Sequence, residues 1–152
     1  MTDVVRKVTG LPASWWLSGG FAIDQFLGFD SRPHGDIDVT VVRSDCPVVY
    51  DAIAGRLEVW MARDGDHSPA ASMEVDDTVD SLWARAPGRG AWLLQANLED
   101  VAGGNWTYRR DPRVRRPVRG VTWHSGRVPC VARGVQLLWK AAAPAGEGQD
   151  RL

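Results

Sequence analysis

The chain has 152 residues, of which 44% are hydrophobic and 24% are charged. This balance is typical of one folded globular domain and excludes wholesale disorder. The 18 basic residues nearly cancel the 19 acidic ones, leaving a net charge of -1, which argues against a globally basic nucleic-acid-binding protein.

Other protein classes are excluded by what the sequence lacks. The two cysteines, Cys46 and Cys130, lie far apart and outside any CxxC pair, so neither a zinc ribbon nor a small disulfide scaffold is expected. The N-terminus has no apolar core of a secretory signal, and no apolar run has the length of a membrane helix. We expect a cytoplasmic protein with reduced thiols and no membrane partner.

The hydrophobic pattern of the first half predicts alternating strands and helices. Gly28 is a plausible stop for one helix, and Pro47 lies where a helix start tolerates proline. The predicted elements are, in order, helix 2–9, strand 14–17, helix 21–27, loop 29–35, strand 37–42, helix 46–56 and strand 57–61.

The second half is predicted to be rich in strands. Pro87–Gly90, Gly103-Gly104 and Ser125-Gly126 are turn signals between apolar runs. After an irregular stretch at 63–77, the predicted elements are strands 79–86, 92–98, 106–108, 121–124 and 127–130, helix 131–143 and a frayed tail at 145–152. The whole chain, 1–152, is therefore expected to be a single α/β or α+β domain.

The eight tryptophans lie mostly in apolar stretches, so they are expected to be core anchors.

The stretch from Ser18 to Gly20 carries the first functional signal. It joins a predicted strand to a predicted helix, and its two glycines let backbone N–H groups approach a ligand closely. A helix N-terminus also carries partial positive charge, which suits a phosphate group. Neither GxGxxG nor GxxxxGK[ST] is present, so Rossmann and P-loop interpretations lack their motifs.

Asp36 and Asp38 carry the second signal. Both belong to the start of a predicted strand, where residues i and i+2 point to the same face. Two adjacent carboxylates repel each other unless a cation lies between them, and Mg²⁺ prefers a few carboxylates together with phosphate oxygens. A phosphate-binding turn followed by such a pair is what nucleotidyl transfer requires.

These residues resemble a known family. The segments Gly19–Asp24 and Arg32–Val39 look like the small nucleotidyltransferases of the polymerase-β-like superfamily, and most like the aminoglycoside and lincosamide nucleotidyltransferase group. Weaker similarity continues through Trp106–Pro117 and Val135–Ala141. The resemblance implies a nucleotidyltransferase fold, in which a mixed twisted sheet is flanked by helices.

The resemblance also implies roles for individual residues. Asp36 and Asp38 would be catalytic and would bind Mg²⁺. The nucleotide would contact Ser18, Gly19, Gly20, Arg32, His34 and Lys140. Arg32 and His34 alternatively serve only in loop packing, and Asp24 is expected to orient either Arg32 or the loop without touching the substrate.

One departure from the family concerns the third acid, which active members use as a base for the attacking hydroxyl. Alternation places Gln95, Asn97 and Glu99 on one face of strand 92–98 and its continuation, opposite Trp92. The two positions expected to carry the acid are amides, which cannot act as a general base near neutral pH. Glu99 would substitute, or Asp80 on the adjoining strand would, or transfer would be inefficient.

An arginine-rich segment, 109–119, raises a separate hypothesis of anion or nucleic-acid binding. The near-zero net charge favours internal pairing with acids such as Asp80, Glu99 and Asp100 instead.

The sequence therefore indicates three candidate functions. The first is Mg²⁺-dependent transfer of a nucleoside monophosphate from a nucleoside triphosphate, most simply ATP, to a hydroxyl of a small aminoglycoside- or lincosamide-like molecule. The second is a nucleotide-binding module of the same fold with little or no activity. The third, nucleic-acid binding, ranks last. A homodimer is one arrangement that would complete the acceptor site.

Overall fold

The computed structural model describes residues 10–70 and 76–141. The predicted helix 2–9 and tail 145–152 lie outside these residues. Three α-helices and ten strands are assigned within them, together with two short 3₁₀ turns, Arg43–Asp45 and Val118–Gly120. The helices are α2 (Gly19–Leu27), α3 (Cys46–Ala54) and α4 (Arg133–Ala141). None of the helices in these residues is long and apolar enough to cross a membrane.

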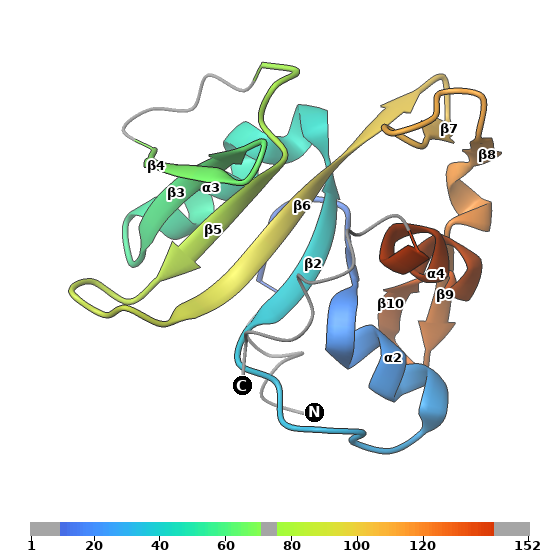
Figure 1. The fold of residues 1–152 in the computed structure, drawn as a ribbon, viewed down its shortest axis with the longest axis horizontal. Coiled ribbons are helices and arrows are strands. Elements are labelled where there is room, and N and C mark those ends of the chain that lie inside the picture. Colours follow the sequence, from blue (N-terminus) through green and yellow to red (C-terminus); the bar gives the residue numbers. More distant parts are fainter. Residues whose placement is uncertain (1–9, 71–75, 142–152) are drawn as a thin grey trace.

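The strands form one mixed sheet (Figure 1). Their bounds are β1 (Trp15–Leu17), β2 (Ile37–Val42), β3 (Glu58–Arg63), β4 (Asp66–Pro69), β5 (Ser81–Arg85), β6 (Trp92–Ala102), β7 (Asn105–Thr107), β8 (Arg115–Pro117), β9 (Thr122–Ser125) and β10 (Val128–Val131). The order across the sheet is β4-β3-β5-β6-β2-β1-β10-β9, and β7 joins β6 to β8. The β2–β6 and β1–β10 pairs are parallel, and the others are antiparallel.

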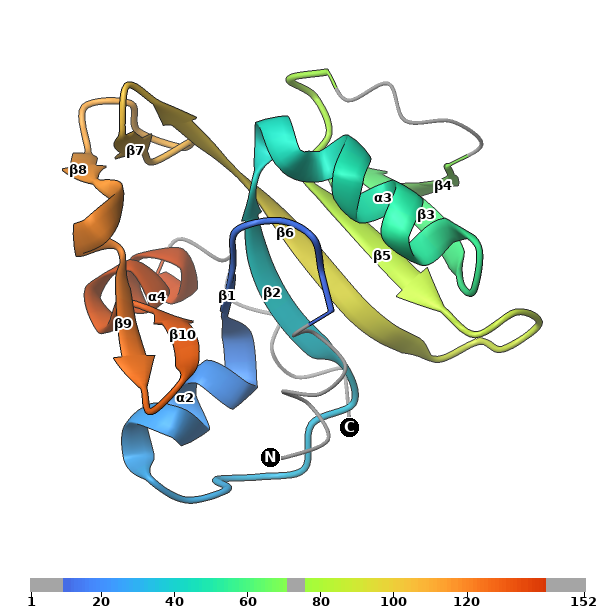
Figure 2. The ribbon, with the colours of Figure 1, turned by 180° about the vertical axis from the view of Figure 1, so that it is seen from behind.

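The core lies between the sheet and the helices. The β-branched run of β2 buries Val39 and Val41 completely, and α3 adds Val49 and Ile53 to the same cluster. Figure 2 shows α3 lying across the β3 and β5 side of the sheet, whereas α2 and α4 lie near β10. The opposite face of β3, β5 and β6 carries no helix among the described residues (Figure 1).

Most predicted elements are confirmed, and the order of strands and helices matches the α+β expectation. Strand 37–42 has the same bounds in the structure, and α2 ends where predicted, at a left-handed Gly28 with φ of 79°. Two strands were missed. The stretch expected to be irregular contains β4, and the arginine-rich segment expected to be loop-like contains β8. Both are short, polar and exposed, so neither has an apolar alternation that would reveal it.

The predicted face of Trp92 was wrong. The register between β5 and β6 shifts at Ala84 and Arg85, so that Arg85 pairs with Trp92 while Ala84 pairs with Leu94. A β-bulge adds one residue to a strand and inverts its side-chain alternation. Trp92 therefore lies on the same face as Gln95, and its ring contacts Trp83 from the neighbouring strand.

Candidate active site

The turn between β1 and α2 is built for close backbone approach. The Ser18 N–H donates to the Asp38 carbonyl at 2.9 Å, which extends the β1–β2 ladder one residue beyond the pair of Leu17 and Val39. Gly19 then adopts a φ of +61°, which a residue with a side chain rarely adopts. The chain therefore enters α2 directly beside the start of β2.

Neither glycine position of this turn has room for a side chain. A Cβ on Gly19 would lie 1.9 Å from Asp38 Oδ2, and a Cβ on Gly20 would lie 2.3 Å from the His34 ring. The Asp38 carboxylate thus packs against bare backbone at the first turn of α2. The leading N–H groups of a helix lack intrahelical partners, so this turn offers donors beside a carboxylate that can hold a cation.

Asp36 and Asp38 occupy one face at the start of β2. Asp36 immediately precedes the strand and Asp38 is its second residue, and both side chains are half-exposed. No group of three or more His, Cys, Asp or Glu residues within residues 10–70 and 76–141 could hold a metal. Two carboxylates nevertheless suit Mg²⁺, which usually keeps several waters and takes its other ligands from phosphates.

The neighbouring strand places an amide beside this pair. The parallel register pairs Asp38 with Gln95 and Thr40 with Asn97. Gln95 Nε2 donates to Asn97 Oδ1 at 2.8 Å. The position adjacent to Asp38 therefore has a hydrogen-bonding group that cannot remove a proton near neutral pH.

Neither alternative acid lies beside Asp38. Glu99 pairs with Val42, four residues further along β6 than Gln95, which is roughly 13 Å at the rise of a strand. Asp80 accepts from the Asp64 N–H and faces Arg109, 3.4 Å away. Their roles as a third acid remain predictions without support from this geometry.

Glu99 has an unusual environment of its own. Burial raises its pKa to about 7, although the Trp106 indole, which donates at 2.5 Å, opposes the rise. The Asp100 charge raises this pKa further, whereas Arg43 and Arg109 lower it. The carboxyl group is thus held at the far end of β6 in a site that favours its neutral form.

Replacing Glu99 with Gln should stabilise the protein at alkaline pH. The folded-state pKa of about 7 exceeds the ordinary 4.5, so the contribution of Glu99 to stability is complete below pH 4.5 and is lost as the pH rises through 7. Above that pH, Glu99→Gln should raise the free energy of unfolding by up to about 3 kcal/mol. Urea unfolding of wild type and Glu99→Gln at pH 5 and pH 8 measures this difference in the free energy of unfolding.

Glu58→Gln is the matched control, because the pKa of Glu58 is lowered by hydrogen bonds from Gly88 and Arg85. This variant should gain nothing at pH 8. An equal effect of Glu99→Gln on the free energy of unfolding at both pH values would contradict the raised pKa of Glu99.

Asp24 fastens the loop that leads into β2. Its Oδ1 accepts hydrogen bonds from the Ser31 N–H and hydroxyl, at 3.0 and 2.5 Å, and its Oδ2 lies 2.7 Å from His34 Nε2. Burial opposes ionisation, yet the bonds from Ser31 and His34 hold the pKa of Asp24 below its ordinary value. Asp24 therefore orients the loop, as the sequence suggested.

Among the remaining predicted nucleotide contacts, the His34 ring packs against Gly20 of the turn, whereas Arg32 and Lys140 are exposed. Arg32 is exposed and donates to the Pro33 carbonyl. His34 is bound to Asp24, and both loop residues line a hollow of about 510 Å³ beside α2. Lys140 is exposed on α4, one turn beyond Gln136 and so on the same side of the helix.

Gln136 was missed by sequence reasoning. It is buried on α4, and its Oε1 accepts a hydrogen bond from the Gly19 N–H at 2.9 Å. This bond connects the late helix to the turn at the start of α2. The available signal was one amide within the otherwise apolar run Val135–Trp139, because a buried amide needs a partner.

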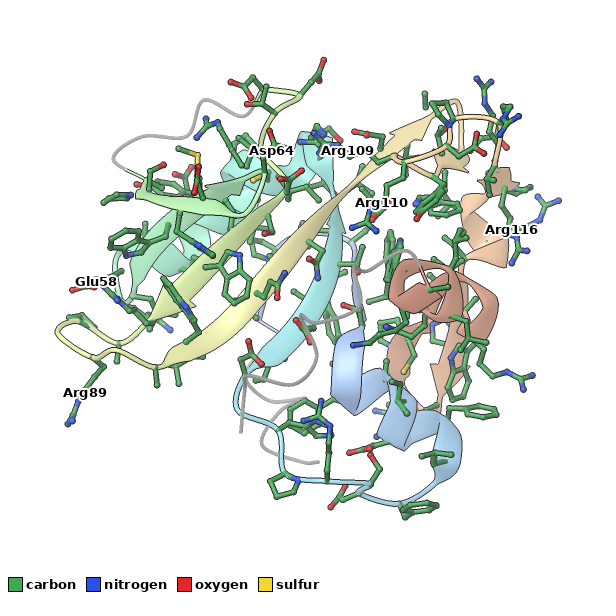
Figure 3. All side chains as sticks on the ribbon, viewed as in Figure 1. Glu58, Asp64, Arg89, Arg109, Arg110 and Arg116 are labelled. Atoms are coloured by element: carbon green, nitrogen blue, oxygen red, sulfur yellow. The ribbon has the colours of Figure 1, made fainter. Side chains whose placement is uncertain are left out.

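The arginine-rich segment does not form one basic face. Arg109 donates to the carbonyls of Val79 and Asp77, and Arg113 forms an ion pair with Asp111 at 2.8 Å. Figure 3 shows Arg110 directed toward the space between β6 and α4, whereas Arg116 points away from it. Internal pairing, the favoured interpretation, is confirmed for Arg109, which also lies 3.4 Å from Asp80, whereas Arg113 pairs with Asp111 inside the segment.

The family match and the fold identify the chain as a nucleotidyltransferase. A Gly-Gly turn at a helix start lies against the Asp38 carboxylate of the adjacent strand, on a mixed sheet flanked by helices. The chain belongs to the aminoglycoside-2''-adenylyltransferase family, whose model matches residues 1–141. This confirms the resemblance seen in the motifs.

The chain is similar to solved structures, and the first of the two described here shares its fold. The lincosamide antibiotic adenylyltransferase LnuA, determined with bound lincomycin, is 17% identical with a TM-score of 0.56, over 91% of this chain and 80% of its own. ANT(2'')-Ia, determined with adenylyl-2''-tobramycin, is 20% identical with a TM-score of 0.48, over 86% of this chain and 64% of its own. No curated protein sequence matches significantly.

Proposed function

We propose that this protein transfers a nucleoside monophosphate from a Mg²⁺-bound nucleoside triphosphate, ATP in the simplest case, to a hydroxyl of a small antibiotic-like acceptor. The observation that carries the proposal is the packing of the Asp38 carboxylate against the bare Gly19 backbone. It brings a cation-binding group and the N–H donors of a helix start to one point. Family membership favours the enzyme over an inactive binding module.

The donor side is formed by α2 and its turn. The Gly20 and Phe21 N–H groups of the first turn would bind phosphate oxygens, because they lack intrahelical acceptors, whereas the Gly19 N–H already donates to Gln136. The Ser18 hydroxyl is buried without a hydrogen-bond partner among the described residues, which fits a group that a phosphate would satisfy. Gln136 orients this turn, and Lys140, one helical turn further on, would neutralise charge on the triphosphate.

Asp36 and Asp38 would hold the metal. Their carboxylates lie on one strand face and are half-exposed, so a hydrated cation can reach both. When bound, Mg²⁺ supplies charge neutralisation for the triphosphate and the departing pyrophosphate. The remaining catalytic work of this chain is to align the phosphates and the acceptor hydroxyl.

Gln95 would position the acceptor hydroxyl. Its amide is committed through Nε2 to Asn97, which leaves Oε1 as an acceptor beside Asp38. A hydroxyl held there keeps its proton until solvent removes it, so we expect slow turnover compared with a site that has a carboxylate base.

The direct test is incubation of the protein with ATP, Mg²⁺ and either tobramycin or lincomycin. We expect pyrophosphate release and an acceptor mass increased by one adenylyl group. The product should appear only when acceptor and Mg²⁺ are both present. Absence of any modified acceptor across both antibiotics, with folded protein and other nucleoside triphosphates included, would contradict the proposal.

A further inference from the structure

A row of side chains continues from the carboxylate pair across the sheet. The register pairs Asp38 with Gln95, Gln95 with Trp83, and Trp83 with Trp60. Directly paired residues point to the same face, about 4.8 Å apart from strand to strand. Two indoles therefore follow Asp38 and Gln95 on the face that carries no helix among the described residues (Figure 1).

The β-bulge adds a third indole to this row. The Trp92 ring lies 5.5 Å from Trp83 and 6.1 Å from Trp60 between centroids. His67 from β4 stacks on Trp92 at 5.6 Å and 22°. We call Trp60, Trp83 and Trp92 the indole cluster. The sequence predicted core anchors, but Trp60 and Trp92 are half-exposed, and only Trp83 is buried.

The indole cluster already contacts a cation, the Arg85 guanidinium, whose charge is balanced by Glu58. The Arg85 guanidinium lies over both Trp60 and Trp92, 4.8 and 5.2 Å from their centroids, and its Nε donates to Glu58 at 2.8 Å. Figure 3 places Glu58 at the outer end of the sheet. Because a cation already occupies the π faces that would attract another, the exposed indole surface favours an uncharged ring.

The position of the indole cluster relative to the proposed nucleotide-binding turn indicates which substrate the cluster would bind. Phosphoryl transfer requires the attacking and leaving oxygens to lie roughly in line. The turn at Gly19 lies on one side of Asp38, and Gln95 followed by the indole cluster lies on the other. With phosphates at the turn, the attacking hydroxyl must come from the side of the indole cluster.

We propose that the indole cluster binds the acceptor through an uncharged, hydroxylated saccharide ring, an assignment that rests on the proposed function. The apolar face of the ring stacks on the indoles, and its hydroxyls reach the amides of Gln95 and Asn97. A hollow of about 490 Å³ lies at the outer end, where Trp60 and Arg85 meet Tyr50 and Ala54 of α3 at the edge of the sheet.

The test is calorimetric titration of lincomycin and of tobramycin into wild type, Trp92→Leu and Trp92→Phe. Stacking on one aromatic ring contributes about 1–3 kcal/mol, so Trp92→Leu should weaken binding of lincomycin, whose sugar carries no charged amine, by about tenfold or more. Tobramycin, whose rings all carry amines, should lose less affinity. Trp92→Phe should recover part of the loss. Binding of Mg²⁺-ATP should be unchanged in both variants.

Trp123→Leu is the matched control. Trp123 is also half-buried, but it lies on β9 at the opposite edge of the sheet. This variant should keep the wild-type affinity for the antibiotics, while thermal unfolding verifies that all variants are folded. Equal antibiotic affinity in Trp92→Leu and wild type, or no binding of either antibiotic to wild type, would overturn the inference.

The two proposals fail in different ways. If the proposed function is wrong, wild type binds the antibiotic without adenylyl transfer even when ATP and Mg²⁺ are saturating. If only the indole cluster is misassigned, transfer occurs and Trp92→Leu keeps the wild-type KM for the antibiotic.

Discussion

Asp38→Asn is expected to reduce adenylyl transfer by about 10³-fold or more, because it removes the charge of the proposed metal ligand that packs against the turn proposed to bind phosphate. Asn preserves the shape that packs against Gly19, so the fold should survive. Asp36→Asn should have a comparable effect, since both carboxylates are needed to hold one cation. Steady-state pyrophosphate release at saturating ATP measures the loss.

Asp51→Asn is the control for this series. Asp51 is an exposed carboxylate on α3, which covers the opposite face of the sheet. Its replacement should leave turnover unchanged. Full activity in Asp38→Asn, at Mg²⁺ concentrations that do not mask weak binding, would remove the carboxylate pair from the mechanism.

Gln95→Glu is expected to increase turnover, which is unusual for an active-site substitution. The register places residue 95 directly beside Asp38, where a carboxylate could take the proton of the attacking hydroxyl. General-base catalysis contributes about 10²–10⁴-fold, and we expect at least about a tenfold gain after the cost of an added negative charge. The rate should also rise with pH as the new carboxyl group ionises.

Asn97→Asp provides the matched control for this gain. It introduces the same charge on the same strand and face, but beside Thr40 instead of Asp38. It should not increase turnover. A similar gain in both variants would indicate a general electrostatic effect, and no gain in Gln95→Glu would show that a base at this position does not limit the reaction.

Local sequence patterns predicted those parts of the site that lie close together in the chain. The apolar run of 37–42 and the Gly-Gly turn located β2, α2 and the Asp36/Asp38 pair. The amides at Gln95 and Asn97 were also placed on one face, because strand alternation holds over that stretch.

Contacts between distant segments could not be predicted in this way. The bond from Gly19 to Gln136 joins residues 117 positions apart, and no local period encodes it. The bulge that turns Trp92 toward Trp83 likewise depends on strand pairing. Single-sequence alternation assumes an unbroken strand, so one extra residue reverses the predicted face.

The most direct measurement of the central claim is calorimetric titration of ATP into the wild type and into the Asp36→Ala/Asp38→Ala variant, each with and without Mg²⁺. We expect ATP binding to wild type that strengthens markedly with Mg²⁺, and no such Mg²⁺ dependence in the variant. Mg²⁺-dependent binding of equal strength in the variant would contradict a nucleotide and metal site at the start of β2.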